Sequence, residues 1–477
     1  MMFHQHSRWS TNKTVSSTRG PAVLVSLLLL IFLLLSLSNP TIALSQELYF
    51  SGGTIPGELR CPDRTPHSTL QLSSRKPDSL MPPEYEELAK FSIHDDTSSQ
   101  HIFLGEPSRA DPSKPFSIGI WGDSHAAFGY FSEGIIREFG LTQVEVQPTF
   151  IPPTMDRSGV RLPIRKFCQS TGWTYEYAYT SSHISAQFAK GLANLKSETP
   201  LSYLWVDFRW HNKNPNLHAL NVLYIPPVSG ENTLVGISTD EGAEKIIKLD
   251  PEGNGIIAIH TEQPISIIKL RLIVGSLVLQ GFVPEYVEKP KMYLDTFGVP
   301  GAKVRGWKSV SAEYLKKTSS DIIYDLVILE YGTNEGNDKN LDPEKYVAEL
   351  RASLKNMRQV YPDSLCVLIG PTDRGILVKN SSRRKTSNTS SSLNELLHYA
   401  QVHKKLGTIQ SAVSKEFSCN YWSWQEAMGG RGSAYMWLHH SPALMSKDLI
   451  HLSIPGYQLS ARKFVADTQL NNFVPNP

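Results

Sequence analysis

The chain has 477 residues, of which 40% are hydrophobic and 19% are charged. This composition is typical of a globular protein with sizeable cores, and the length allows one to three domains. The 47 basic and 45 acidic side chains leave a formal net charge of +2, which argues against a nucleic-acid-binding protein. The four cysteines are widely spaced and form no CxxC pair, which argues against a structural zinc site.

The N-terminal segment is expected to be either a secretory signal peptide or a membrane anchor. Arg8, Lys13 and Arg19 precede the stretch "PAVLVSLLLLIFLLLSLS", whose apolar run of roughly 16 residues has the length of a long signal core or a short membrane span. Small residues in the following "TIALSQ" suit a cleavage site. Both alternatives predict an exported protein in the periplasm or cell envelope, attached to the membrane if the segment is retained.

Export makes disulfides feasible, but four cysteines allow three pairings, and the sequence leaves the choice open. Cys366 lies inside an apolar run. It is therefore expected to be a buried thiol rather than half of a bridge.

Residues 46–114 are rich in proline, serine and charge, and we interpret them as a lead-in or linker. A strand is then expected at "PFSIGIWG" and a helix at "HAAFGYFSEGIIREFG", where Phe128, Phe131, Ile135 and Phe139 follow each other at helical spacings. Together these two elements begin an α/β domain.

The pattern changes after Leu141 into short β-branched and aromatic runs separated by turn residues, which is typical of a β-sandwich. The block is long enough for a domain of its own. The runs are "VEVQPTF", "LSYLWVDFRW", "ALNVLYI", "NTLVGIS", "EKIIKLD", "GIIAIHT", "ISIIKLRLIV" and "SLVLQGFVPEYVEK".

Strands and helices alternate again from about Met292. Buried strands are expected at "KMYLDTF", "YDLVILEY" and "SLCVLIG", with helices between and after them. One helix has Asp342 as a cap and Pro343 at its first position. This alternation predicts a parallel sheet covered on both faces, and hence one α/β domain split by an inserted sandwich. The expected division is residues 1–45, 46–114, 115–140 (first part of the α/β domain), 141–290 (sandwich) and 291–477 (second part).

Three polar turns follow strands of this sheet, where ligands bind in open parallel sheets. Ser124 in "GDSH" is the candidate nucleophile, which needs a neighbouring base to take its proton. The predicted base is His451. Asp448 precedes it by three residues and would hold the imidazole in the correct tautomer.

The charge that develops on an attacked carbonyl oxygen requires hydrogen-bond donors. The candidates for this oxyanion hole are the backbone N–H groups of Ser124 and Gly301 and the side-chain amide of Asn334. The combination predicts acyl transfer through a serine nucleophile.

In this order, the motifs resemble the four blocks of the SGNH (GDSL-type) hydrolase superfamily, which is named for its serine, glycine, asparagine and histidine. The resemblance covers roughly residues 115–140 and 292–470 and implies a flavodoxin-like, three-layer α/β fold with a parallel sheet. The matching positions are Ser124 in "GDSH", Gly301 in "GVPGA", Asn334 in "GTNE" and His451 in "DLIH", with Asp448 as the triad aspartate.

The jelly-roll-like insertion resembles the carbohydrate-binding-module-like domain of bacterial peptidoglycan O-acetylesterases, and "GDSHAA" and "WSWQEAMGGRGSAYMW" also fit that branch. The resemblance implies a cofactor-independent serine esterase that removes acetyl groups from O-acetylated peptidoglycan, at the C6 oxygen of its muramoyl residues. Two alternatives stay open: an O-acetyltransferase on the same fold, and a non-catalytic glycan-binding protein.

Other conspicuous residues favour structural roles. His125 either approaches substrate or hydrogen-bonds the local turn, and the second reading is preferred. Adjacent His439 and His440 diverge on most backbones and have no supporting carboxylate or cysteine spacing, so no metal site is expected. An aromatic cluster is expected to line the core and a groove rather than form a sugar platform: Tyr421, Trp422, Trp424, Tyr435 and Trp437.

Overall fold

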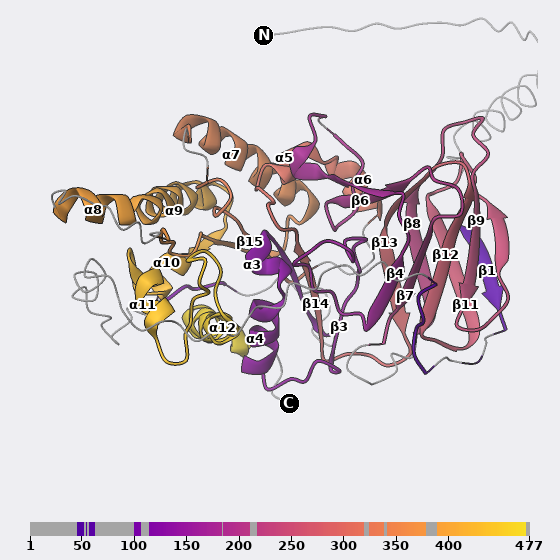
Figure 1. The fold of residues 1–477 in the computed structure, drawn as a ribbon, viewed down its shortest axis with the longest axis horizontal. Coiled ribbons are helices and arrows are strands. Elements are labelled where there is room, and N and C mark those ends of the chain that lie inside the picture. Colours follow the sequence, from indigo (N-terminus) through magenta and orange to yellow (C-terminus); the bar gives the residue numbers. More distant parts are fainter. Residues whose placement is uncertain are drawn as a thin grey trace, which may run out of the picture. The chain divides into compact units, whose positions relative to one another are not determined.

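The computed structural model describes most of the chain after its first 44 residues (Figure 1). The predicted signal peptide or anchor therefore lies outside the described residues, except for Ser45. Within the described part, no helix combines the length and the apolar character that a membrane crossing requires. The described residues are 45–51, 54, 57–62, 100–105, 114–183, 185–209, 217–318, 324–337, 341–377 and 389–473.

A six-stranded, all-parallel sheet lies at the centre of the α/β part. Its strands, in spatial order, are β17 (Asn420–Trp422), β16 (Leu365–Ile369), β15 (Leu326–Glu330), β2 (Phe116–Gly122), β14 (Met292–Gly298) and β3 (Val146–Gln147). The interpretation of "VEVQPTF" as a sandwich strand is wrong, because β3 pairs with β14 at the edge of this sheet.

Helices cover both faces of the sheet, as its alternating side chains require. Ile118 of β2 and Ile328 of β15 pack into a core shared with α4 and α12. Trp121 and Leu329, at odd-numbered offsets from these two residues, pack into the opposite core with α5, α7 and α9 (Figure 1). The predicted three-layer architecture is thereby confirmed.

Asp342 caps α7, as predicted, by accepting the N–H groups of Glu344 and Lys345, and Pro343 is the first residue of the helix. The expected helix after "GDSH" is broken at Gly129, which adopts a left-handed conformation between two shorter helices. The helices are α3 (Ser124–Ala127), α4 (Tyr130–Glu138), α5 (Gly306–Ser309), α6 (Ala312–Thr318), α7 (Pro343–Val360), α8 (Thr389–Leu396), α9 (His398–Glu416), α10 (Trp424–Ala427), α11 (Ser433–His439) and α12 (Ile454–Thr468), with short 3₁₀ turns η1 (Ala178–Thr180) and η2 (Leu470–Asn472).

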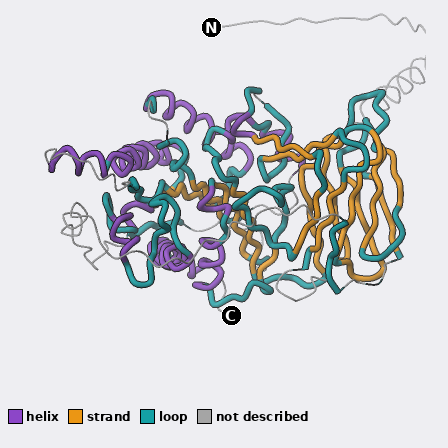
Figure 2. Tube along the Cα trace, in the orientation of Figure 1, coloured by secondary structure: helices purple, strands orange, loops and turns teal. Residues whose placement is uncertain are grey.

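Two further sheets face each other across a separate apolar core (Figure 2). Leu220 and Val222 from one sheet and Ile268 and Leu270 from the other contribute to this core. The first sheet has the order β1 (Gln46–Phe50), β11 (Ile256–Ile265), β8 (Leu217–Ile225), β13 (Leu277–Tyr286), β6 (Ala193–Ser197) and β5 (Trp173–Tyr177). The second has the order β10 (Lys245–Lys248), β9 (Leu234–Thr239), β12 (Ile267–Val274), β7 (Tyr203–Asp207) and β4 (Lys166–Gln169).

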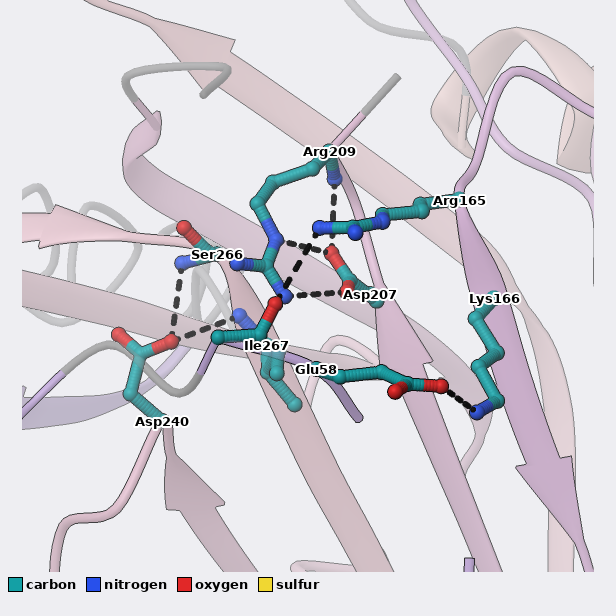
Figure 3. Close-up of polar contacts among 9 residues, drawn as sticks. Glu58, Arg165, Lys166, Asp207, Arg209, Asp240, Ser266 and Ile267 are labelled. Atoms are coloured by element: carbon teal, nitrogen blue, oxygen red, sulfur yellow. Dashed lines mark hydrogen bonds and ion pairs between the residues drawn. The ribbon is translucent and has the colours of Figure 1, made fainter. Parts of the chain in front are cut away.

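The start of the predicted lead-in takes part in this sandwich. β1 pairs in parallel with β11, although the other strand pairs of the sandwich are antiparallel. A disulfide joins Cys61 to Cys168 of β4, and Glu58 forms an ion pair with Lys166 at 2.9 Å (Figure 3). The described residues within 46–62 are therefore fastened to the sandwich, whereas Gln100 and Ile102 of the same predicted lead-in bond to the α/β part.

A buried ion pair lies in the same sandwich (Figure 3). Arg209 donates to both carboxylate oxygens of Asp207, at 2.8 and 2.5 Å. The side chains are only 6% and 1% exposed. Asp240 nearby accepts the backbone N–H groups of Ser266 and Ile267, and burial raises the pKa of Asp240 to about 6. This network stabilises the ends of neighbouring strands.

The expectation that Cys366 is a free buried thiol is wrong. Cys366 and Cys419 form a disulfide. Val367 of β16 pairs with Asn420 of β17, so the preceding residues of the two strands lie side by side. The sequence gives no indication of this register, because it depends on a short edge strand.

Candidate active site

Ser124 stands at the carboxyl end of β2, where it is the first residue of α3. The preceding Asp123 caps the helix, because its side chain accepts the backbone N–H of His125 at 2.9 Å. The turn depends on Gly122. A Cβ atom at this position would lie 2.6 Å from a Glu330 carboxyl oxygen and 2.7 Å from the Ala126 Cβ.

The structure brings Ser124, His451 and Asp448 together. Ser124 Oγ lies 2.9 Å from His451 Nε2. His451 Nδ1 lies 2.7 Å from Asp448 Oδ2. Ser124 and His451 are 327 residues apart in the sequence. The three side chains are hydrogen-bonded in the order that a nucleophile, a base and an orienting carboxylate would require.

Asp448 is held as a carboxylate by its surroundings. Burial opposes ionisation, but hydrogen bonds from the His451 side chain and from two backbone N–H groups outweigh it, so the pKa of Asp448 falls to about 2. The two N–H groups belong to Ile450 and His451, both at 2.9 Å. Leu449, directly after Asp448, adopts a φ of +57°, a left-handed conformation that bends the chain back toward the carboxylate.

Gly301 lies in the loop after β14, beside the nucleophile turn. The backbone N–H of Val299 donates to the carbonyl of Gly122 at 3.1 Å and ties the two loops together. Gly301 has a φ of +88°, which a residue with a side chain adopts only at a cost. The glycine is therefore needed for the shape of this loop.

Asn334 lies in the loop after β15 and points into the same region. Its side-chain nitrogen donates to Asp123 Oδ2 and to the carbonyl of Ala302, both at 3.0 Å. Both N–H groups of the amide are thus engaged in this state of the protein. Asn334 links the nucleophile turn to the loop that carries Gly301.

A group of buried carboxyl groups that the sequence analysis missed lies beneath these loops. Asp123, Glu330 and Glu335 are 0%, 1% and 5% exposed. Burial raises the pKa of Glu335 to about 7. Burial, and then repulsion by Asp123, raises the pKa of Glu330 well above its usual value. A glutamate that ends an otherwise apolar strand, as in "LVILE", was the available signal.

His125 is fully buried behind the candidate base. Its Nδ1 lies 3.0 Å from the Tyr457 hydroxyl, and its ring centroid lies 5.4 Å from that of His451. Burial lowers the pKa of His125 well below its usual value. A neutral ring therefore packs against His451 and against Trp424.

The adjacent histidines and the predicted aromatic cluster lie apart from the hydrogen-bonded chain of Ser124, His451 and Asp448 in the sequence, and the structure shows their local surroundings. His440 Nδ1 bonds to the Pro442 carbonyl at 2.8 Å. Over the part of the chain that the structure describes, no three histidine, cysteine or acidic side chains gather in a way that could hold a metal ion. Four of the five clustered aromatics are buried at 3% exposure or less, as a core role requires: Trp422, Trp424, Tyr435 and Trp437.

Comparison with solved structures places the fold. The model superposes on a peptidoglycan O-acetylesterase with a TM-score of 0.54 and 19% identity, over 79% of this chain and 99% of that one. This similarity confirms the predicted α/β fold with its parallel sheet. The agreement with the predicted SGNH hydrolase architecture concerns the fold.

Two other solved structures are less similar to this chain. A family two carbohydrate esterase from Cellvibrio japonicus matches with 13% identity and a TM-score of 0.25, over 64% of this chain and 98% of that one. A putative GDSL-like lipase from Parabacteroides merdae matches with 21% identity and a TM-score of 0.25, over 38% and 74%. No family model and no curated protein matches the sequence.

Proposed function

We propose that the protein is an exported serine esterase that removes O-acetyl groups from a cell-wall glycan, with peptidoglycan as its substrate. The observation that carries the proposal is the continuous hydrogen-bonded chain from Ser124 through His451 to Asp448. This chain of hydrogen bonds lies at the carboxyl ends of parallel strands, where open parallel sheets bind their ligands. Export is proposed from the basic and apolar N-terminal sequence alone.

The geometry supports a two-step reaction. Ser124 Oγ attacks the acetyl carbonyl carbon as its proton passes to His451 Nε2, 2.9 Å away. The bond to the sugar oxygen then breaks, and the imidazolium returns the proton to that oxygen, which leaves acetyl-Ser124. Water, deprotonated by the same imidazole, releases acetate and restores the serine.

Asp448 stabilises the imidazolium that forms in each step, because its low pKa keeps it charged at neutral pH. The proposed oxyanion donors are the N–H groups of Ser124 and Gly301 and the amide of Asn334. For Asn334 to serve, one of its hydrogen bonds to Asp123 and Ala302 must be exchanged for the oxyanion.

Peptidoglycan is the preferred substrate for two reasons. One solved structure that shares the fold, with a TM-score of 0.54, is a peptidoglycan O-acetylesterase, and the "GDSHAA" motif and the inserted sandwich resemble that branch. Ser124, His451 and Asp448 are compatible with any O-acetylated glycan, so the experiment tests the substrate directly.

The test measures free acetate and the mass of muropeptides after incubation of O-acetylated peptidoglycan with the full chain. We expect acetate release and loss of the acetyl mass, with neither in Ser124→Ala. Ser132→Ala is the matched control, because Ser132 is also buried near the nucleophile turn but bonds to the Gly129 carbonyl.

Two outcomes would replace the proposal. Transfer of the acetyl group to an added glycan, without free acetate, indicates an O-acetyltransferase. Binding of the glycan with no change in its mass indicates a non-catalytic binding protein.

A further inference from the structure

Three tyrosines form a stacked row along the edge of the sandwich. Strand alternation places Tyr175 and Tyr177 on one face of β5, and Tyr179 follows in η1. Neighbouring ring centroids are 5.7 and 5.4 Å apart, with interplanar angles of 17° and 26°. All three side chains are partly exposed, unlike the buried tryptophans near the candidate base.

The row ends beside the candidate active site. The Tyr179 hydroxyl lies 3.7 Å from the position that a Cβ of Gly301 would take. Arg305, four residues beyond this glycine, donates its Nε to the Tyr179 carbonyl at 2.7 Å. The last ring of the row is thus fixed next to the loop that carries a proposed oxyanion donor.

Arg157 extends the same surface. Its guanidinium lies 5.8 Å from the centre of the Tyr177 ring, and Nη2 donates to the Pro300 carbonyl at 3.4 Å. Among the described residues, neither Arg157 Nε nor the Tyr177 hydroxyl has a hydrogen-bond partner, although both atoms are buried. Buried polar atoms without partners are uncommon in folded proteins and call for an explanation.

The row is also held in place before any ligand binds. The Tyr175 hydroxyl accepts the backbone N–H of Asp156 at 3.1 Å, which fixes the turn that carries Arg157. Tyr177 and Tyr179 pack against the core of the α/β part, whereas Tyr175 packs against the core of the sandwich. The surface therefore spans from the sandwich to the loop of Gly301.

We propose that Tyr175, Tyr177, Tyr179 and Arg157 form a binding subsite for the glycan strand that continues from the acetylated sugar at Ser124. The chemistry fits a polysaccharide. Phenol rings offer apolar surface to the C–H faces of sugars, and the guanidinium and phenolic groups offer hydrogen bonds to sugar hydroxyls. This inference rests on the proposed function, because the strand is positioned by its acetyl group.

The experiment compares O-acetylated peptidoglycan sacculi with 4-nitrophenyl acetate, which carries no glycan strand. For Tyr177→Ala we expect the ratio of kcat/KM on sacculi to kcat/KM on the small ester to fall roughly tenfold. Arg157→Ala, which removes no packed ring, is expected to lower the same ratio by a smaller factor.

Tyr203→Ala is the matched control. Tyr203 is also a partly exposed tyrosine on a sandwich strand and lies against an aromatic neighbour, Trp205, but it belongs to the other sheet. We expect this variant to keep the wild-type ratio. An unchanged ratio in both Tyr177→Ala and Arg157→Ala, or an equal fall in Tyr203→Ala, would overturn the proposal.

A binding measurement separates failure of the subsite from failure of the proposed function. Ser124→Ala protein is sedimented with sacculi, with and without the additional Tyr177→Ala change. We expect the double variant to bind about tenfold more weakly. If wild-type protein hydrolyses neither ester, the proposed function fails while this comparison still decides the subsite, and equal binding by the two proteins rejects it.

Discussion

The parallel sheet and the sandwich use their strands in different ways. Strands β2 and β15 are buried along their whole length, so the polar groups of the α/β part gather in the loops at their carboxyl ends. β5 of the sandwich alternates partly exposed and exposed residues and can itself present a row of rings. We therefore expect chemistry from the loops of the α/β part and binding from a strand face of the sandwich.

The largest effect is expected from the nucleophile. Ser124→Ala should lower kcat for acetate release by about a millionfold, because the serine and its base act as one unit. The fold should persist, since the serine side chain is small and lies at the start of a short helix. Acetate assays with circular dichroism as a fold check test this, and substantial turnover by the variant would break the assignment of chemistry to this loop.

Asp448→Asn should have the next largest effect. The change keeps the shape of the side chain but removes the charge that orients and stabilises the imidazolium, and we expect kcat to fall about 10⁴-fold. Asp467→Asn is a control at a carboxylate that accepts the Trp422 indole N–H on the far side of the core. A comparable loss in both variants would point to instability rather than to the reaction.

Asn334→Ala should lower kcat by about 10²–10³-fold with a smaller effect on KM, because an oxyanion donor acts mainly in the transition state. The variant also removes hydrogen bonds to Asp123 and Ala302. Steady-state kinetics on the small ester separate the two constants. A change confined to KM would assign Asn334 to substrate binding. The loops of the α/β part would then contribute to binding as well as to chemistry.

The smallest effect concerns pH and stability. The raised pKa of Glu335, about 7 against an ordinary 4.5, means that the folded protein keeps a proton that the unfolded chain releases. The contribution of this bound proton to the free energy of unfolding is therefore fully present below pH 4.5. It declines as the pH rises toward 7, by on the order of 2–3 kcal/mol.

Glu335→Gln should flatten this decline, because the amide oxygen can still accept the Val304 N–H while no charge can form. Urea unfolding at pH 5 and pH 8 measures the difference, with Glu344→Gln at an exposed position of α7 as the control. A wild-type stability that rises over this interval by a similar amount would show that Glu335 is ionised in the folded state.

The polar loops at the carboxyl ends of the strands could be predicted from the sequence, because each of their motifs is local. Ser124 and Asn334 each lie in a short polar stretch after an apolar strand, and the neighbouring positions of β2 and β15 in the sheet bring these two stretches together. His451 lies in a loop before α12, and its late Asp-x-x-His motif was the local signal. The buried carboxyl groups escaped prediction, since a single glutamate at the end of "LVILE" is easily assigned to the following turn.

Elements of the sandwich were harder to predict for physical reasons. Half of the four residues of β4 are polar, and polar residues alternate along β5, so both lack the apolar runs that identified the other strands. β3 is only two residues long, and its partner is chosen by tertiary packing. The disulfide of Cys366 depends on the same kind of edge pairing. The alternation in "WTYEYAY" was the one available signal for the tyrosine row.

The central claim is that His451 activates one serine hydroxyl. Labelling of the full-length protein by a fluorophosphonate, followed by peptide mass spectrometry, tests it most directly. We expect a single adduct on Ser124 that forms at least about 10³-fold more slowly in His451→Ala. An adduct on another serine, or equal labelling rates with and without the imidazole, would contradict it.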